Sequence, residues 1–224
     1  MSKSPVPLGV VTALAALILS GCGALQPGAA VEVGDETISL DRVDEVAGDF
    51  CSAIEPQLEA QAETIPNSFL RGGIAGTLGL RSAADQIADD YGVDPESDQY
   101  LEALAGIRDG VAEVPEELQE SVIEVESAPA YVEAVQAAVG EVILDGDGEY
   151  EDFVAAGTDE YETWLAENGI EFDPALNTVV KDGVIETEDG GVSFAVSELA
   201  KNGLAEQPNS VIARQMPATH RCGR

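Results

Sequence analysis

The side chains that could do covalent chemistry are few in this 224-residue sequence. It has one histidine, His220, close to the carboxyl end, and three cysteines. A single histidine cannot build a multi-histidine metal site, and the G-x-S-x-G, H-E-x-x-H and G-K-[ST] motifs are all missing from the sequence. The 43 acidic residues are too evenly spread for one acid–base pair to stand out. The sequence therefore predicts neither an enzyme nor a cofactor.

The run DGDGE at 145–149 is the one segment with a metal-like pattern. It is similar to the start of a calcium loop, but an EF-hand needs a glutamate at the twelfth position, where this chain has Ala156. We expect a turn between two helices, with calcium binding as the alternative.

The amino-terminal residues have the pattern of an export signal. A lysine precedes an apolar run over 6–19, which is too short for a comfortable membrane span. The motif LSGC, ending at Cys22, resembles the lipobox of bacterial lipoproteins. That resemblance implies a signal peptide over 1–21, a lipidated Cys22 acylated with fatty acids such as palmitate, and a short tether over 22–30. The alternative is an ordinary secretory signal with an incidental cysteine.

Setting the lipid-bearing cysteine aside leaves two, Cys51 and Cys222. An even remainder in an oxidising, exported compartment favours a disulfide between them. Cys51 falls on an apolar helix face, whereas Cys222 lies in a polar tail that has little other reason to be ordered. The bond would clamp the tail to that helix. Two free thiols are the alternative.

The charge balance limits the partners. The formal net charge is −33, from 43 acidic and only 10 basic side chains. Nucleic acid is excluded because phosphate binding needs clustered Lys and Arg. Between Arg108 and Lys181 there are 20 acidic residues and no basic one. This stretch is either a solvated helical surface, which we favour, or a face that attracts cations or basic polypeptides.

Hydrophobic spacing predicts a helical middle. We expect helices over about 41–63, with Asp41 as N-cap, and over about 68–91. A third should begin at Pro95, a fourth at Pro115 with an interruption at Pro129, and a last over about 149–167. Short β-rich runs precede and follow these helices, including a hairpin around Lys181-Asp182-Gly183. The expected fold is mainly α (α+β), with a small sheet that pairs the two ends.

The two β-containing ends resemble a known family. VEVGDETIS at 31–39, followed by Val43 and Asp44, resembles the start of the SurA-type chaperone N-terminal domain, which PrsA-type foldases and trigger-factor-like peptide-binding domains share. WLAENGIEF at 164–172 is similar to that family's final helix and strand. The resemblance implies one peptide-binding domain over 31–224. Too few residues follow Ile170 for a parvulin domain, so prolyl-isomerase activity is not expected.

Three functions follow from these observations. The first is a lipid-anchored protein on the extracytoplasmic face of the cell membrane that binds unfolded or extended polypeptides. The second is an assembly lipoprotein that uses the same fold for one dedicated envelope partner. The third, an enzyme, has the least support. The sequence does not indicate which residues bind the peptide.

Overall fold

The computed structural model describes residues 25–181, 183–188, 195–205 and 207–224, and its mainly helical fold with small antiparallel sheets confirms the expected α+β class. Cys22 and the segment expected to be an export signal lie outside the described residues. In chain order the elements are β1 (Ala29–Val33), β2 (Glu36–Ser39), α1 (Leu40–Gln61), β3 (Ile65–Pro66), α2 (Asn67–Tyr91), α3 (Asp98–Gly110), α4 (Glu116–Ile143), α5 (Tyr150–Asn168), β4 (Ile170–Phe172), η1 (Pro174–Leu176), β5 (Thr178–Lys181), β6 (Val184–Thr187), α6 (Glu198–Gly203), α7 (Ser210–Ala213), η2 (Ala218–His220) and β7 (Arg221–Cys222).

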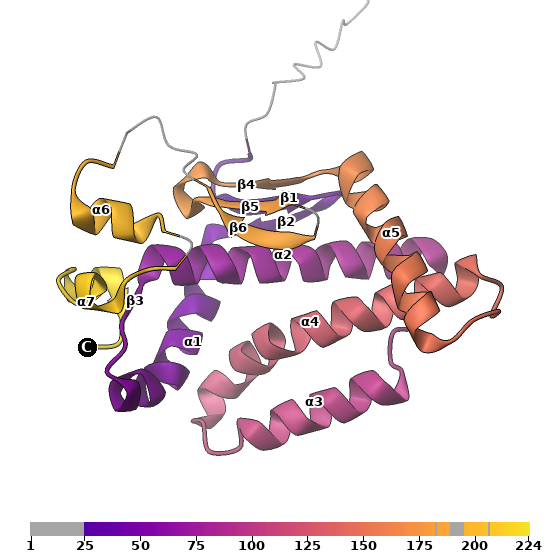
Figure 1. Ribbon diagram of the computed structural model, residues 1–224, viewed down its shortest axis with the longest axis horizontal. Coiled ribbons are helices and arrows are strands. Elements are labelled where there is room, and N and C mark those ends of the chain that lie inside the picture. Colours follow the sequence, from indigo (N-terminus) through magenta and orange to yellow (C-terminus); the bar gives the residue numbers. More distant parts are fainter. Residues whose placement is uncertain (1–24, 182, 189–194, 206) are drawn as a thin grey trace, which may run out of the picture.

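The main sheet joins the two ends of the helical region. Strand β1 lies between β2, its hairpin partner, and β4, which follows α5 (Figure 1). The antiparallel register pairs Val31 with Phe172 and Val33 with Ile170, and both valines are fully buried. The predicted pairing of the ends is confirmed. Strand β1 begins at Ala29, two residues before the expected start of the domain, because its first residues are already buried in the sheet.

The predicted hairpin is also confirmed, as the separate two-stranded sheet β5–β6. An isolated hairpin is only marginally stable in water, so it needs a surface to pack on. That surface is α2, where a Cβ atom at Gly76 would lie only 2.7 Å from the side chain of Ile185. The glycine therefore lets the hairpin approach the helix closely.

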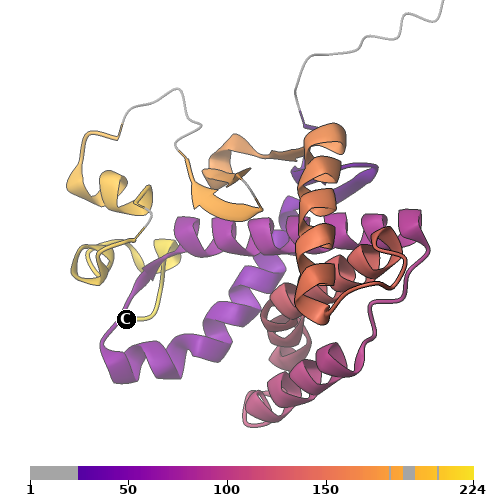
Figure 2. The same cartoon turned by 45° about the vertical axis from the view of Figure 1, so that its right-hand side comes forward.

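Helix α2 is the central element. The main sheet and the β5–β6 hairpin lie along one side of it, and α1 and α4 pack on other sides (Figures 1 and 2). Two apolar clusters form along its length. The cluster near its carboxyl end joins α2 to α4 and α5, and the cluster near its amino end joins it to β1 and α1. Their buried members include Ile87, Val135, Val139, Tyr161 and Trp164 in the first, and Val31, Val43, Val46, Ile74 and Leu176 in the second.

Two helix starts differ from the sequence prediction. The N-cap of α1 is Ser39, not Asp41, and its Oγ accepts a hydrogen bond from the N–H of Arg42 at 3.1 Å. Helix α3 begins after Ser97, not at Pro95. Both serines have extended backbone, which directs the hydroxyl toward the first-turn amides. Asp41 lies inside the first turn, where its negative charge interacts favourably with the positive end of the helix dipole.

The predicted interruption at Pro129 is wrong, because α4 is continuous across it. A proline inside a helix costs about 3 kcal/mol. Helix α4 packs against both α2 and α5, and it has buried residues on either side of the proline, including Ala128 and Val135. These contacts hold the two halves on one axis and offset the cost.

The last part of the chain, residues 195–224, forms what we call the C-terminal arm, which contains α6, α7, η2 and β7. Its last strand, β7, pairs with β3, and Cys222 is bonded to Cys51 of α1, with the two Cα atoms 5.7 Å apart. The structure thus contains the predicted disulfide. Gly223 follows with φ +82°, and a Cβ atom there would lie 2.9 Å from the carbonyl oxygen of Glu63. Only glycine fits this turn without strain.

Candidate functional site: an apolar groove beside the C-terminal arm

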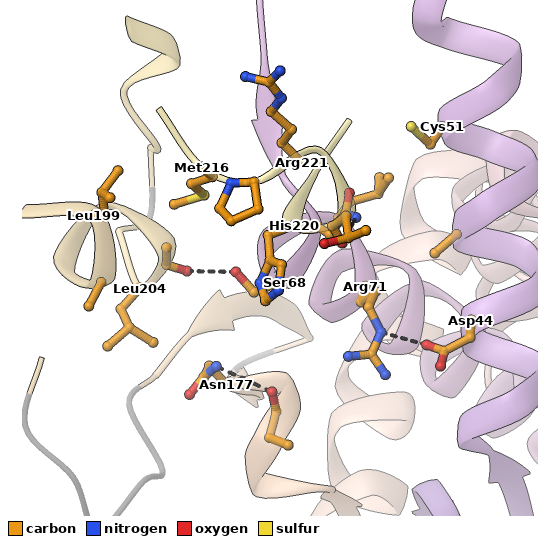
Figure 3. Close-up of a pocket in the computed structure, with 18 of the residues that line it drawn as sticks. Asp44, Cys51, Ser68, Arg71, Asn177, Leu199, Leu204, Met216, His220 and Arg221 are labelled. Carbon is orange, nitrogen blue, oxygen red and sulfur yellow. Dashed lines mark hydrogen bonds and ion pairs between the residues drawn. The ribbon is translucent and has the colours of Figure 1, made fainter. Parts of the chain in front are cut away.

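An open groove of about 1350 Å³ lies between the C-terminal arm and the helical body (Figure 3). One wall is formed by α1, the start of α2 and the η1 turn, and the other by the arm. The lining residues are Asp44, Ala47, Gly48, Cys51, Asn67, Ser68, Leu70, Arg71, Pro174, Ala175, Asn177, Ala195, Ser197, Leu199, Ala200, Gly203, Leu204, Met216, Pro217, Thr219, His220 and Arg221.

The lining of the groove is mostly apolar. Leu70 contributes from α2, whereas Leu199, Leu204 and Met216 contribute from the arm. The volume exceeds the roughly 300–1,000 Å³ of ordinary small-molecule sites. Methionine adapts its shape to irregular partners, and the small residues of α1 leave room for the main chain of a ligand. The groove can therefore hold an extended segment that carries several apolar side chains.

The charged groups of the groove differ from those of the rest of the chain. Arg71 donates from its Nε to Asp44 at 2.5 Å, and this ion pair lies on the body side of the groove. Arg221 and His220 are also in the lining, and among the described residues that line the groove Asp44 is the only acidic one. The groove is thus a weakly charged region in a chain with a net charge of −33. Extended main chain could lie there without facing a wall of carboxylates.

The arm is held against the body by polar contacts to the connection between α1 and α2. Thr64 donates its N–H to Oγ of Ser210 at 2.6 Å and its hydroxyl to the carbonyl oxygen of Arg224 at 2.7 Å. The side chains of Asn67 and Ser68 donate to carbonyl oxygens of the arm at 3.1 and 3.2 Å. The start of α2 therefore both lines the groove and fixes its opposite wall.

A smaller cavity of about 480 Å³ lies between α2 and the β5–β6 hairpin. Phe69, Ile74 and Ile185 line it, together with Val125 of α4. Leu70 lines both this cavity and the groove. Its volume lies within the roughly 300–1,000 Å³ of ordinary small-molecule sites, so it has less room for an extended segment than the groove has.

Two partly buried tyrosines lie between helices outside the groove. Tyr131 of α4 donates its hydroxyl to Asp85 of α2, and the guanidinium carbon of Arg81 is 4.4 Å from the ring centroid. Burial and the bond to Asp85 raise the pKa of Tyr131. Burial and a bond to Glu133 raise the pKa of Tyr150 to about 12. Both phenols are neutral at neutral pH, so we assign them to packing.

The residues singled out in the sequence have different outcomes. Cys51 and Cys222 come together, and Cys51 also lines the groove. The segment 145–149 is the predicted turn, with positive φ at Asp145 and Gly146, and among the described residues no cluster of three or more His, Cys, Asp or Glu is placed to hold a metal. Sequence reasoning missed the groove itself. The available signal was the apolar Leu199, Leu204 and Met216 near the carboxyl end of the chain.

Comparisons with known proteins returned no relative, since no family model, curated protein or solved structure matches this chain. Within the residues that the structure describes, no helix is both long and apolar enough to cross a membrane. The fold and the site together define a mainly helical α+β domain with an apolar groove, one wall of which is tied to the body by a disulfide.

Proposed function

We propose that this protein is a lipid-anchored, extracytoplasmic lipoprotein that binds unfolded or extended polypeptide segments without prolyl-isomerase activity. The observation that carries the proposal is the open apolar groove of about 1350 Å³. Its lining suits a polypeptide of varied sequence, because it offers apolar contact and few charged groups that would select one partner.

The order of the elements supports a chaperone-like role. The β1–β2 hairpin leads directly into α1, and α5 leads into β4, which pairs with β1. This is the arrangement that the resemblance to the SurA-type N-terminal domain implies. The resemblance itself rests on the sequence motifs at the two ends of the helical region.

Binding would be non-covalent and weak. Each square ångström of apolar surface removed from water contributes about 25 cal/mol, but ordering an extended segment cancels much of that gain. The acidic surface of the body would keep a complex with an aggregation-prone client soluble and would draw basic segments toward the protein. The result is a holdase that captures and releases its clients without altering them.

We expect labelled unfolded polypeptides rich in apolar and basic residues to bind with micromolar affinity at low salt. Because exposed charges are screened over about 8 Å at physiological ionic strength, we expect the affinity to fall by roughly threefold there, with the apolar contribution retained. Fluorescence anisotropy with several unrelated clients measures this. No association with any of them at low salt would contradict the proposal.

A dedicated envelope partner is the second candidate, because the groove could equally hold one fixed segment of another protein. An aggregation assay with several unrelated clients separates the two functions. A holdase suppresses aggregation of all of them, whereas a dedicated adaptor suppresses none and copurifies from crosslinked cells with one protein.

The location has its own test. We expect Cys22→Ala to release the protein from the membrane fraction or to stall its processing, because the thioether anchor and the adjoining acyl chains would be lost. Membrane fractionation and metabolic labelling with a palmitate analogue measure both effects. Cys51→Ala is the matched control, since it also removes a cysteine and should leave the labelling intact. Unchanged labelling in Cys22→Ala would overturn the lipid anchor.

A further inference from the structure

The disulfide of this protein is positioned beside the groove, where a reagent that enters the groove can reach one of its two cysteines. Cys51 lies on α1 and its side chain lines the groove, where it is only partly buried (Figure 3). Its bonding partner Cys222 is fully buried. A small or protein thiol that enters the groove therefore meets Cys51 first. Attack on Cys51 makes Cys222 the leaving sulfur.

The arm depends on this bond for its place. Residues of the arm form one whole wall of the groove, and its end is tied to the body by the disulfide and by the two-residue ladder between β3 and β7. The other ties of the described residues include hydrogen bonds to Thr64, Asn67 and Ser68, one from the Arg214 guanidinium to the carbonyl oxygen of Ala62, and an exposed ion pair between Arg224 and Glu59. Such polar contacts exchange with water at little net gain.

We propose that the Cys51–Cys222 disulfide is a reversible redox site, and that its reduction by a dithiol releases the C-terminal arm and removes one wall of the groove. The effect on ligand binding rests on the function proposed above, whereas release of the arm does not. The oxidised protein has the assembled groove and binds clients, and the reduced protein lets them go.

The chemistry is a thiol–disulfide exchange with a dithiol reductant. One thiolate of the reductant attacks the Sγ of Cys51, and the bond between Cys51 and Cys222 breaks. The electron pair leaves on the Sγ of Cys222, which takes up a proton. The second thiol of the reductant then attacks the reductant's first sulfur, which is bonded to Cys51 in the mixed disulfide. The bond to Cys51 breaks, and Cys51 takes up a proton and is freed as a thiol. Two electrons and two protons pass to the protein, and the reductant becomes a disulfide.

The charges of the two chain segments that carry the cysteines favour this direction of attack. Cys222 lies between Arg221 and Arg224 in the chain, in an arm that is the most basic part of an acidic protein. Positive charge stabilises a departing thiolate. Cys51 lies on a helix that carries several carboxylates, including Asp44 and Asp49, which would stabilise its thiolate less.

Limited trypsin digestion of the full oxidised chain, with and without dithiothreitol, tests release of the arm. We expect cleavage after Arg214 and Arg221 to accelerate at least tenfold on reduction, while cleavage after Arg108 in α3 stays unchanged. The acceleration should track the fraction of chains in which both cysteines become alkylated. Full alkylation without faster cleavage of the arm would overturn the proposal.

Two further measurements complete the experiment. In the double variant Cys51→Ser and Cys222→Ser, cleavage of the arm should be fast with or without dithiol; if this variant does not fold, the titration of alkylation against cleavage in the wild-type chain decides alone. Anisotropy of a labelled client is measured on the same samples, and we expect affinity to fall at least tenfold on reduction. If even the oxidised protein binds no client, the proposed function fails, and faster cleavage on reduction still supports the redox site.

Discussion

Replacing Gly157 by alanine should lower the free energy of unfolding by about 3 kcal/mol, the upper end of the usual cost of overpacking. Gly157 lies where α5 crosses α4, and a Cβ atom there would lie only 1.7 Å from the carbonyl oxygen of Gln136. On the facing helix, a Cβ atom at Gly140 would lie 1.8 Å from the carbonyl oxygen of Phe153. The obstacles are backbone atoms, so the helices themselves must separate. Denaturant unfolding followed by circular dichroism measures the loss.

Gly106→Ala is the matched control for this prediction. Gly106 is an exposed glycine inside α3, with no heavy atom within 4 Å of a Cβ atom built there. Alanine at an unhindered helical position is favoured over glycine by roughly 0.5–1 kcal/mol, so this variant should be slightly more stable than the wild type. If Gly157→Ala were as stable as Gly106→Ala, the close crossing of α4 and α5 would be contradicted.

The second large effect concerns the groove. Gly48 is an exposed residue of α1 that lines the groove, and no heavy atom lies within 4 Å of a Cβ atom built there. A Cβ atom there meets no neighbour, so a phenylalanine side chain can leave the helix at this point, and we expect it to occupy the space that a bound segment needs. We expect Gly48→Phe to weaken client binding at least tenfold, which corresponds to about 1.4 kcal/mol. The midpoint of unfolding should not fall, because phenylalanine is the better helix former.

Gly106→Phe is the matched control, because it separates the effect of a ring in the groove from the effect of adding an aromatic ring anywhere on the surface. It makes the same change at an exposed, unhindered helical glycine that does not line the groove. Its affinity for clients should match the wild type. If the wild type and both variants bound clients with equal affinity, the groove would not be the binding site. An equal loss of affinity in both variants would point to a general surface effect.

The arrangement of the two ends was within reach of the sequence. The alternating valines at 31 and 33 and the apolar Ile170 and Phe172 predict strands, and short strands at both ends of a helical region need each other for stability. The cysteine count then predicts the disulfide, because only two cysteines remain after Cys22, the expected lipidation site, is set aside. Both are arguments about pairing, which local pattern and simple counting can support.

The groove could not be predicted in the same way. Its walls come from segments about 150 residues apart, as in the contact between Asn67 and Thr219, and no local pattern reports such a distance. The continuity of α4 across Pro129 has the same cause, because packing against α2 and α5 outweighs the local preference to break the helix. Tertiary contacts decide both features, and the sequence shows them only after the neighbours are known.

Photo-crosslinking tests the central claim most directly. An unfolded client that carries a photoreactive group is bound to the oxidised protein, irradiated, digested and analysed by mass spectrometry. We predict crosslinks to the groove residues of α1, the start of α2 and the arm, among them Leu70, Leu204 and Met216. Crosslinks confined to the acidic helices α3 and α4 would contradict the account, since the client would then be held by surface charge and not by the groove.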